Sequence, residues 1–381
     1  MISEETCRLI DRFVLRLVQD STPQRTAWNQ EQIRQGKPST WNYIDGCMLT
    51  ALLSLSEITG DPSWANFVES VANDFISEEG AIRTFQPEKH TLDDINEGRI
   101  LFPLWHATGK EKYRKAADVL HSALEAQPRT AEGSFWHKEI YPNQVWLDGL
   151  YMAQPFAALY EKTFGSGDYS DILHQLETVV SHMRDPKTGL YYHGWDSSRS
   201  AFWADPETGL SQNFWLRAIG WFAVALADLA EILPAGPEAT RVAEILCRLM
   251  TDVLPFSEDA TGMYYQVVDQ PEAPGNYLET SGSSMLAYAM LKGARLGILD
   301  PGFAQAGEKT FAGIVDRYLT VNANGQLNLG GICLVAGLGP ESNRRRDGSL
   351  VYYLSEPIVE NDAKGIAPFL LCYTEILRLM K

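Results

Sequence analysis

The sequence predicts an all-α fold, an (α/α)6 barrel of six helical hairpins, on the strength of three observations. Apolar residues recur with the 3.6-residue period of a helix in about twelve segments, which are separated by loops rich in Gly, Pro and Asp. The segments alternate between helices with one charged face and helices that are apolar nearly all round. No strict repeat of roughly 34 residues is visible, so a closed double ring is favoured over an open solenoid.

The predicted helices follow one another along the whole chain. The first, over residues 4–19, has an apolar stripe of Leu, Ile, Phe and Val with arginines facing away from it. The same period recurs over residues 43–58, 63–77, 94–107, 111–126, 146–163, 168–184, 212–232, 237–253, 280–296, 302–319 and 360–379. Only short stretches, such as 189–193 and 262–266, are typical of hairpin strands.

Two kinds of helix are expected to form the two rings. Segments 63–77 and 111–126 carry a charged face, as helices exposed to solvent on one side do. Segments 146–163 and 280–296 are apolar or small nearly all round, as helices covered on both sides are. No linker or shift in composition divides the chain, so residues 1–381 are predicted to form a single domain.

The charge of the chain limits its partners. Its 381 residues include 32 Lys and Arg against 49 Asp and Glu, which gives a formal net charge of −17. A surface this acidic repels phosphate backbones, so a nucleic-acid partner is not expected. A membrane partner is not expected either, because no apolar run approaches the roughly 20 residues that a spanning helix needs.

The N-terminus and the cysteines predict a cytoplasmic protein. The first residues are acidic and show neither the basic start nor the apolar stretch of a secretory signal. The five cysteines are scattered and form no C-x-x-C pair, which favours reduced thiols over disulfides or a zinc site. Metal-binding and phosphate-binding motifs are missing as well, so no cofactor and no metal are expected. The protein is predicted to be a monomer or a weak homo-oligomer.

Many tryptophans lie within a few residues of Gly, Asp or His, which is unusual for core residues alone. They are Trp41, Trp136, Trp146, Trp195, Trp203, Trp215 and Trp221. Core packing is the commoner role of any single Trp. As a group with polar neighbours, they are typical of a sugar-binding cleft, where flat rings stack on pyranose faces.

Three aspartates are candidates for a functional role. Asp148 lies just inside a helix that is otherwise apolar, and a buried carboxylate costs several kcal/mol unless it is paired or protonated. That cost favours a catalytic role for Asp148 over a structural one. Asp93 and Asp94 open another predicted helix, where the structural alternative is that one of them is the N-cap.

Five blocks of sequence then resemble a known family. They are LDDINEGR (92–99), FWHKEIYPNQVWLDGLYMAQPF (135–156), GLYYHGWDSSRS (189–200), WADPETGLSQNFWLRAIGW (203–221) and SEPIVENDAKGIAPF (355–369). Together they resemble the unsaturated rhamnogalacturonyl hydrolases of glycoside hydrolase family 105, which are related to the unsaturated glucuronyl hydrolases of family 88. The fold of that family, an (α/α)6 barrel, agrees with the periodicity.

The resemblance implies an unusual hydrolysis. The substrate is a small oligosaccharide whose non-reducing end is a 4-deoxy-4,5-unsaturated uronate left by a polysaccharide lyase. A carboxylic acid protonates C4 of the vinyl ether, water adds at C5, and the hemiketal opens to release the next sugar, expected to be rhamnose. Neither a metal nor a covalent intermediate is required.

The resemblance also implies the residues of the site. Asp148 would be the general acid and base, with Asp93 as the supporting carboxylate. Substrate contacts would come from His137, His193 and Arg217 and from candidate sugar platforms at Trp41, Trp195 and Trp221. Trp146 and Lys138 complete the expected binding residues, because Trp146 helps to desolvate Asp148 and Lys138 offers a cation to the uronate.

Other readings stay open at this point. One keeps the fold and the acid but changes the substrate to glucuronyl saccharides from ulvan or glycosaminoglycans. Another is a sugar-binding barrel without turnover, which the cost of burying Asp148 disfavours, and a third is a sugar epimerase, which would centre on histidine pairs. The basic run Arg344–Arg346 is expected to be a solvated loop, with the grip of a longer anionic chain as the alternative.

Overall fold

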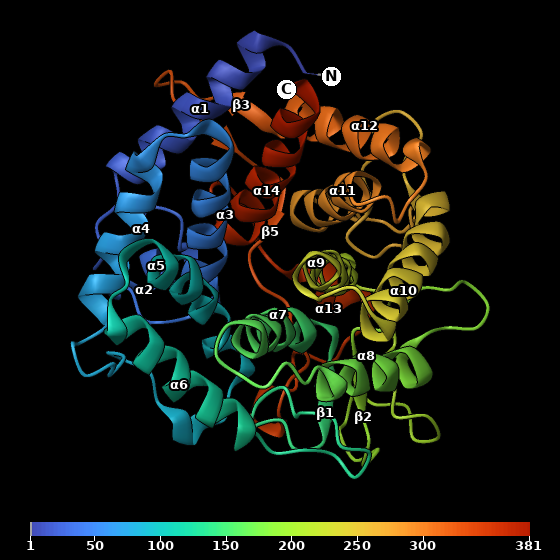
Figure 1. Ribbon diagram of the computed structural model, residues 1–381. Coiled ribbons are helices and arrows are strands. Elements are labelled where there is room, and N and C mark those ends of the chain that lie inside the picture. Colours follow the sequence, from blue (N-terminus) through green and yellow to red (C-terminus); the bar gives the residue numbers. More distant parts are fainter. Residues whose placement is uncertain (1) are drawn as a thin grey trace.

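The computed structural model describes residues 2–381, and its helices form two concentric rings (Figure 1). The inner ring consists of α3 (Tyr43–Thr59), η3 (Asn96–Ile100) with α5 (Leu101–Thr108), α7 (Leu147–Thr163), α9 (Leu216–Ile232), α11 (Thr280–Arg295) and α14 (Ala363–Met380). The outer ring consists of α1 (Glu4–Gln19), α4 (Pro62–Phe75), α6 (Glu111–Glu125), α8 (Ser170–Met183), α10 (Pro237–Val253) and α12 (Pro301–Tyr318). The predicted (α/α)6 barrel is therefore confirmed.

The inner ring is closed by contacts between neighbouring helices. In ring order, α3 packs against η3, η3 against α7, α7 against α9, α9 against α11, and α11 against α14, which returns to α3. The last helix therefore lies beside the first inner helix although more than 300 positions separate them in the chain. Because each inner helix follows an antiparallel outer one, all inner helices begin at the same end of the barrel (Figure 1).

The twelve predicted helices are all present, with bounds that shift by a few residues. The largest differences are at the predicted segment 94–107, which starts as 3-10 turns, and at 212–232, whose helix begins at Leu216. Two short helices, α2 (Gln30–Gln35) and α13 (Leu350–Ser355), carry too little periodicity to be predicted.

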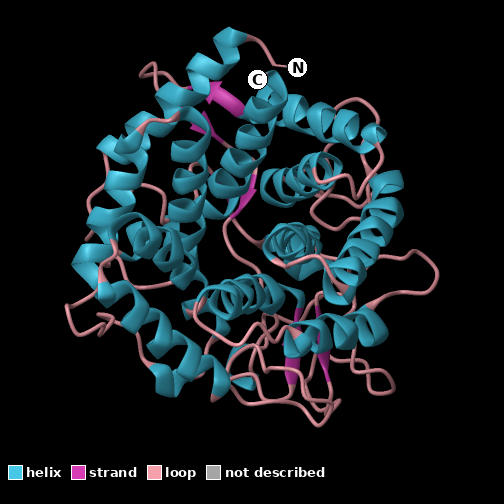
Figure 2. Ribbon diagram, in the orientation of Figure 1, coloured by secondary structure: helices cyan, strands magenta, loops and turns pink. Residues whose placement is uncertain are grey.

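Strands are few and short (Figure 2). They form three antiparallel pairs: β1 (Gln144–Trp146) with β2 (Gly194–Asp196), β3 (Leu319–Val321) with β4 (Leu327–Leu329), and β5 (Ile332–Cys333) with β6 (Ile358–Val359). The expected strand pieces at 189–193 and 262–266 were wrong as strands, since each has only an isolated bridge within it. The chain instead forms β2 immediately after the first of these pieces.

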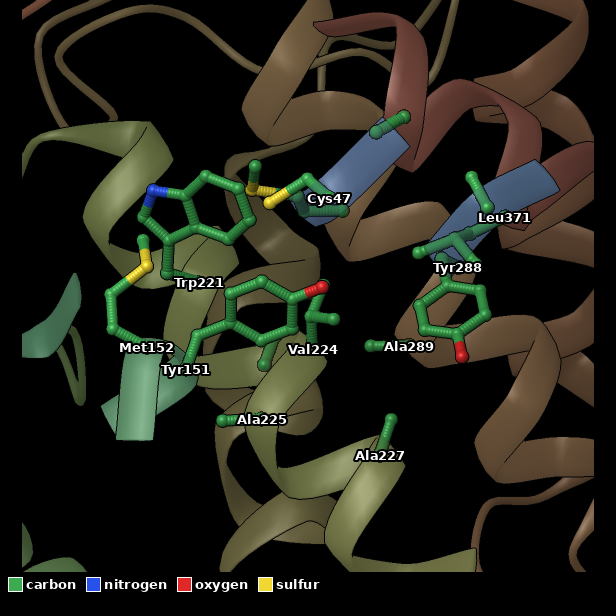
Figure 3. Packing of buried hydrophobic residues seen from close by; sticks show 14 of the residues in the cluster. Cys47, Tyr151, Met152, Trp221, Val224, Ala225, Ala227, Tyr288, Ala289 and Leu371 are labelled. Atoms are coloured by element: carbon green, nitrogen blue, oxygen red, sulfur yellow. The ribbon is translucent and has the colours of Figure 1, made fainter. Parts of the chain in front are cut away.

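The two kinds of helix differ in burial as the sequence indicates. Every residue of α9 from Leu216 to Leu229 is buried, whereas α6 buries only one face. Close packing explains the small residues of α11: a side chain at Gly282 would overlap Leu216 of α9. Figure 3 shows the resulting core, in which the Trp221 ring of α9 stacks on Tyr151 of α7 with centroids 4.7 Å apart.

A network of buried charges also joins the inner helices. The Asp228 carboxylate lies 2.6 Å from Arg99 Nη2 and 2.8 Å from Lys292 Nζ, and it accepts a hydrogen bond from the Tyr288 hydroxyl at 2.7 Å. Although burial opposes ionisation, Lys292 and Arg99 lower the pKa of Asp228 to about 2. The stabilisation by this carboxylate is therefore present at neutral pH and is lost as the pH falls from about 4 toward 2.

We expect Asp228→Asn to lower the free energy of unfolding by about 3–5 kcal/mol, because the buried Arg99 loses its counter-charge and the buried Lys292 keeps only its pair with the more exposed Glu231 at 2.8 Å. Urea denaturation at pH 7 measures this change. The control is Glu177→Gln, which breaks a pair with Arg241 whose side chains are 40% and 38% exposed. That variant should cost about 1 kcal/mol or less, and equal losses in the two variants would contradict the role of the buried network.

None of the helices formed by residues 2–381 is both long and apolar enough to cross a membrane.

Candidate active site

The site residues gather where the inner helices begin. Asp148 and Arg217 are the second residues of α7 and α9, Tyr43 is the first residue of α3, and Asp93 lies just before η3. These starting points converge, because the charges of Asp93 and Arg217 both act on the Tyr43 hydroxyl. The positive ends of several helix dipoles therefore face one region, which favours an anionic ligand there.

The antiparallel pair of β1 and β2 places Asp148 beside His193. Trp146 pairs with Gly194 across the two strands, and the Leu147 amide donates to the His193 carbonyl at 3.1 Å. As a result, Asp148 Oδ2 lies 3.3 Å from His193 Nε2. The other ring nitrogen, Nδ1, lies 2.7 Å from the Tyr353 hydroxyl of α13, so the imidazole is held from both sides.

Asp148 is enclosed without being neutralised by a lysine or arginine. Its side chain is 12% exposed, and Oδ2 accepts no hydrogen bond from another described residue. Its nearest charged or titratable partner among the described residues is the imidazole of His193. A carboxyl group held in this way is available for proton transfer.

Asp93 lies in a second, ion-paired environment. The Thr91–Leu92 segment bridges to His137–Lys138, with the Leu92 amide donating to the His137 carbonyl at 3.2 Å. This pairing brings Asp93 Oδ2 against Lys138 Nζ and Asp93 Oδ1 to 3.5 Å from His137 Nε2. Burial disfavours both charges, but their attraction lowers the pKa of Asp93 and raises the pKa of Lys138.

His137 stands between the two acids. Burial lowers the pKa of His137 to about 4, and the charges of Asp93 and of Asp148 oppose that shift. The imidazole is therefore neutral at pH 7 and can form hydrogen bonds without adding charge. The structure thus brings Asp93, His137, Asp148 and His193 into one site, as the resemblance implies.

The structural alternative for the two neighbouring aspartates was wrong. Thr91 occupies the N-cap position of the turn η2 (Leu92–Asp94), and that turn has no side-chain cap. The Asp94 carboxylate receives no hydrogen bond from another described residue, while its backbone carbonyl accepts from Trp41 Nε1 at 2.8 Å and its amide donates to the Thr91 carbonyl at 3.3 Å. Neither aspartate is therefore explained by helix capping.

The tryptophans of the predicted site are all nearly buried. Trp146 stacks on His137 and on Tyr141 with centroids 4.4 and 4.6 Å apart, and Trp195 stacks on His182 at 4.1 Å. Trp221 stacks on Tyr151, and Trp41 meets Phe75 edge to face. Their stacking on a sugar stays a prediction.

Arg217 is also buried, with 1% of its side chain exposed. Its Nε donates to the Ser281 hydroxyl at 2.7 Å, its Nη2 donates to the Cys333 carbonyl, and Glu279 lies 3.6 Å away. Arg217 thus acts on the site through its charge and through the elements that it holds. Direct contact with substrate stays a prediction.

A cavity of about 530 Å³ opens beside the Asp93–Lys138 pair. Asp93, Asp94, Lys138 and Tyr43 all line it, and Tyr43 in turn contacts Trp221 edge to face at 6.4 Å. Its size suits a small ligand. The resemblance implies a role for Asp93 alone, whereas the structure places both Asp93 and Asp94 in the same cavity wall.

The long contacts of the site could not be found from the sequence. Tyr353, which holds His193, lies 160 positions further along the chain. Its only signal was its place directly before the block 355–369. The described residues contain no group of three or more His, Cys, Asp or Glu side chains that could hold a metal ion.

The Arg344–Arg346 loop is on the surface, as expected. Arg344 and Arg345 are 65% and 55% exposed, and they pair with Glu341 and Glu356 at 2.9 Å. The Arg344 guanidinium also lies 4.8 Å over the Phe202 ring.

Comparisons with known proteins support the family that the sequence resembles. A family model described as Glycosyl Hydrolase Family 88 matches residues 14–380. A solved family 105 glycoside hydrolase from C. acetobutylicum ATCC 824 is 39% identical, with a TM-score of 0.89 over 98% of this chain and 99% of that one. The unsaturated glucuronyl hydrolase from Bacillus sp. GL1 shares the fold, with 16% identity and a TM-score of 0.68 over 98% of this chain and 97% of its own.

Among curated proteins, the unsaturated rhamnogalacturonyl hydrolase YesR of Bacillus subtilis strain 168 is 25% identical over 283 residues. That match covers 72% of this chain and 76% of YesR. The chain therefore belongs to the related glycosyl hydrolase families 88 and 105, and it is a hydrolase of unsaturated glycosides.

Proposed function

We propose that the protein removes the 4,5-unsaturated uronate from short rhamnogalacturonan fragments, in which rhamnose is the next sugar. The observation that carries this proposal is the state of Asp148, an enclosed carboxyl group that faces His193 and has no lysine or arginine partner among residues 2–381. The similarity to YesR supports rhamnose as the neighbouring sugar.

In the proposed reaction, Asp148 supplies the proton that bonds to C4 of the vinyl ether. Water then bonds to C5 and returns its own proton to the Asp148 carboxylate, so one water is consumed and the acid is restored. The hemiketal at C5 opens to a ketone and leaves a hemiacetal at C1, which collapses to an aldehyde and releases the rhamnose with its hydroxyl group. His193, fixed by Tyr353, keeps the Asp148 carboxyl group in position.

The substrate carries a carboxylate into a protein of net charge −17, so local positive potential is needed. Three features supply it: the starts of the inner helices, the Lys138 ammonium and the buried Arg217 guanidinium. Lys138 is 26% exposed and lines the cavity, so it is the cation best placed to approach the uronate.

A panel of lyase-generated oligosaccharides tests the proposal. Loss of the ultraviolet absorbance of the C4=C5 bond with unsaturated galacturonyl-rhamnose is the expected result. Loss of this absorbance only with glucuronyl products would indicate that the substrate is instead an ulvan or glycosaminoglycan fragment. No loss with any member of the panel would contradict the proposed activity.

Asp94 should make substrate affinity depend on pH. Burial, and then repulsion from Asp93, raise the pKa of Asp94 to about 7, while Lys138 and Lys89 oppose the shift. Asp94 is therefore largely neutral at pH 6 and negative at pH 8 in a cavity that takes an anion. We expect KM to rise about fivefold between these pH values, which corresponds to repulsion on the order of 1 kcal/mol.

Steady-state kinetics of Asp94→Asn check this expectation, because the variant cannot ionise and should show a flat KM profile. Glu88→Gln is the matched control, since Glu88 lines the same cavity. It should keep the rise in KM. A rise of the same size in Asp94→Asn would show that another group is responsible.

A further inference from the structure

A second cavity lies next to the first, across the turn that follows Lys138. Its volume is about 500 Å³, and it is lined by residues 142–144 on one side and by residues 200–202 and the 339–342 loop on the others. Ile140 lines both cavities, and its side chain is 61% exposed. One exposed apolar side chain thus forms part of the wall of both cavities.

The wall of the second cavity is continuous with the β1–β2 strand pair beside Asp148. Gln144 is the first residue of β1 and pairs with Asp196 of β2, in the same ladder that sets Trp146 opposite Gly194. Asp148 follows Gln144 by four positions. A ligand in this cavity would therefore lie on the strand pair that positions the acid.

The lining of this cavity contains an amide with a free donor. Gln144 is 5% exposed, and its Oε1 accepts a hydrogen bond from Trp146 Nε1 at 3.2 Å. Its Nε2 donates to no other described residue. The nitrogen itself reaches solvent, so it is free to donate to a hydroxyl or carboxylate oxygen of a ligand in the cavity.

The remaining lining suits a sugar ring. Phe202 and Pro340 give flat apolar surface, and Asn143 and Ser342 add polar groups. The Asp196 carboxylate accepts backbone hydrogen bonds from residues 198, 200 and 201, which fixes the loop and leaves little capacity for a ligand. At the rim, the Arg344 guanidinium lies over Phe202, is 65% exposed, and pairs at 2.9 Å with Glu341, which also lines the cavity.

We propose that this second cavity is a distal subsite, which binds a sugar of the oligosaccharide beyond the two that flank the cleaved bond. The inference rests on the proposed function and adds to it a preference for chains longer than a disaccharide. Arg344 would pair with the carboxylate of the distal sugar where that sugar is a uronate. The basic loop thereby gains a role that the sequence left as an alternative.

The test compares an unsaturated disaccharide with the tetrasaccharide from the same rhamnogalacturonan digest. Ser342→Trp places an indole in the cavity from an exposed loop position. We expect it to raise KM for the tetrasaccharide about tenfold, equivalent to 1.4 kcal/mol, and to leave KM for the disaccharide within about twofold. Gln144→Glu keeps the oxygen that accepts from Trp146 but removes the free amide donor, and it should also weaken the tetrasaccharide selectively.

Ala260→Trp, at an exposed turn outside the cavities described above, is the control and should change neither substrate. The proposal of a distal subsite would be overturned if Ser342→Trp changed KM equally for both substrates, or if it left KM for the tetrasaccharide unchanged. Turnover of the disaccharide by the unaltered protein tests the proposed function separately. If the unaltered protein turns over neither substrate, calorimetric titration of the tetrasaccharide into the unaltered protein and into Ser342→Trp still tests the distal subsite, because binding does not require catalysis.

Discussion

Asp148→Asn is expected to lower kcat by about 1000-fold or more, because the amide cannot deliver a proton to C4 of the vinyl ether. The amide has nearly the shape of the carboxyl group and can still face His193 Nε2, so substrate affinity should change by less than about threefold. Loss of ultraviolet absorbance measures kcat, and calorimetric titration measures binding.

The fold must be shown to survive this change. Asp148 has no buried cation that would lose its partner, so the free energy of unfolding of Asp148→Asn should stay within about 1 kcal/mol of the original value. Near-normal turnover by a folded Asp148→Asn protein would refute the role of this residue as the acid.

Asp93→Asn is expected to have the second-largest effect on catalysis, a loss of about 100-fold in kcat. Asp93 holds Lys138 and faces His137, so the variant frees an ammonium group and removes the negative charge beside the imidazole. The unpaired Lys138 then adds positive charge where the substrate develops a cation during protonation. Steady-state kinetics at pH 6 measure the loss.

The adjacent Asp94 is a matched control, since it has the same side chain in the same cavity wall. Asp94→Asn should leave kcat at pH 6 within about twofold, because Asp94 is then already largely neutral. If Asp94→Asn lost turnover and Asp93→Asn did not, the supporting carboxylate would be Asp94, and the resemblance over residues 92–99 would have been carried over one position out of register.

The sequence predicted the helices because local patterns determine them. Segment 63–77 shows a charged face and segment 280–296 does not, and these differences correspond to the outer and inner rings. The starts of the helices were less certain, since the turns at residues 92–100 have no periodicity of their own. The helix that packs against α3 and closes the ring is far from α3 in the sequence, so local patterns could not identify it. Only the similarity in fold indicated this contact.

The site was predictable in its acids and less so in their partners. The cost of a carboxyl group in an apolar helix pointed to Asp148, and the paired environment of Asp93 follows from a bridge between residues 91 and 138. Tyr353 reaches His193 from a short helix far along the chain, and the partners of Arg217 come from residues 279–333. Spacing along one helix identifies neighbours on that helix but not across a barrel.

The central claim is that cleavage begins with delivery of a proton from Asp148 to one face of C4. The most direct measurement is to run the reaction in D2O and to locate deuterium in the uronate product by NMR during the first turnovers. The account predicts one deuterium at C4, in a single configuration, appearing at the rate at which rhamnose is released. Release of rhamnose before any deuterium enters C4, or deuterium in both configurations from the start, would contradict it.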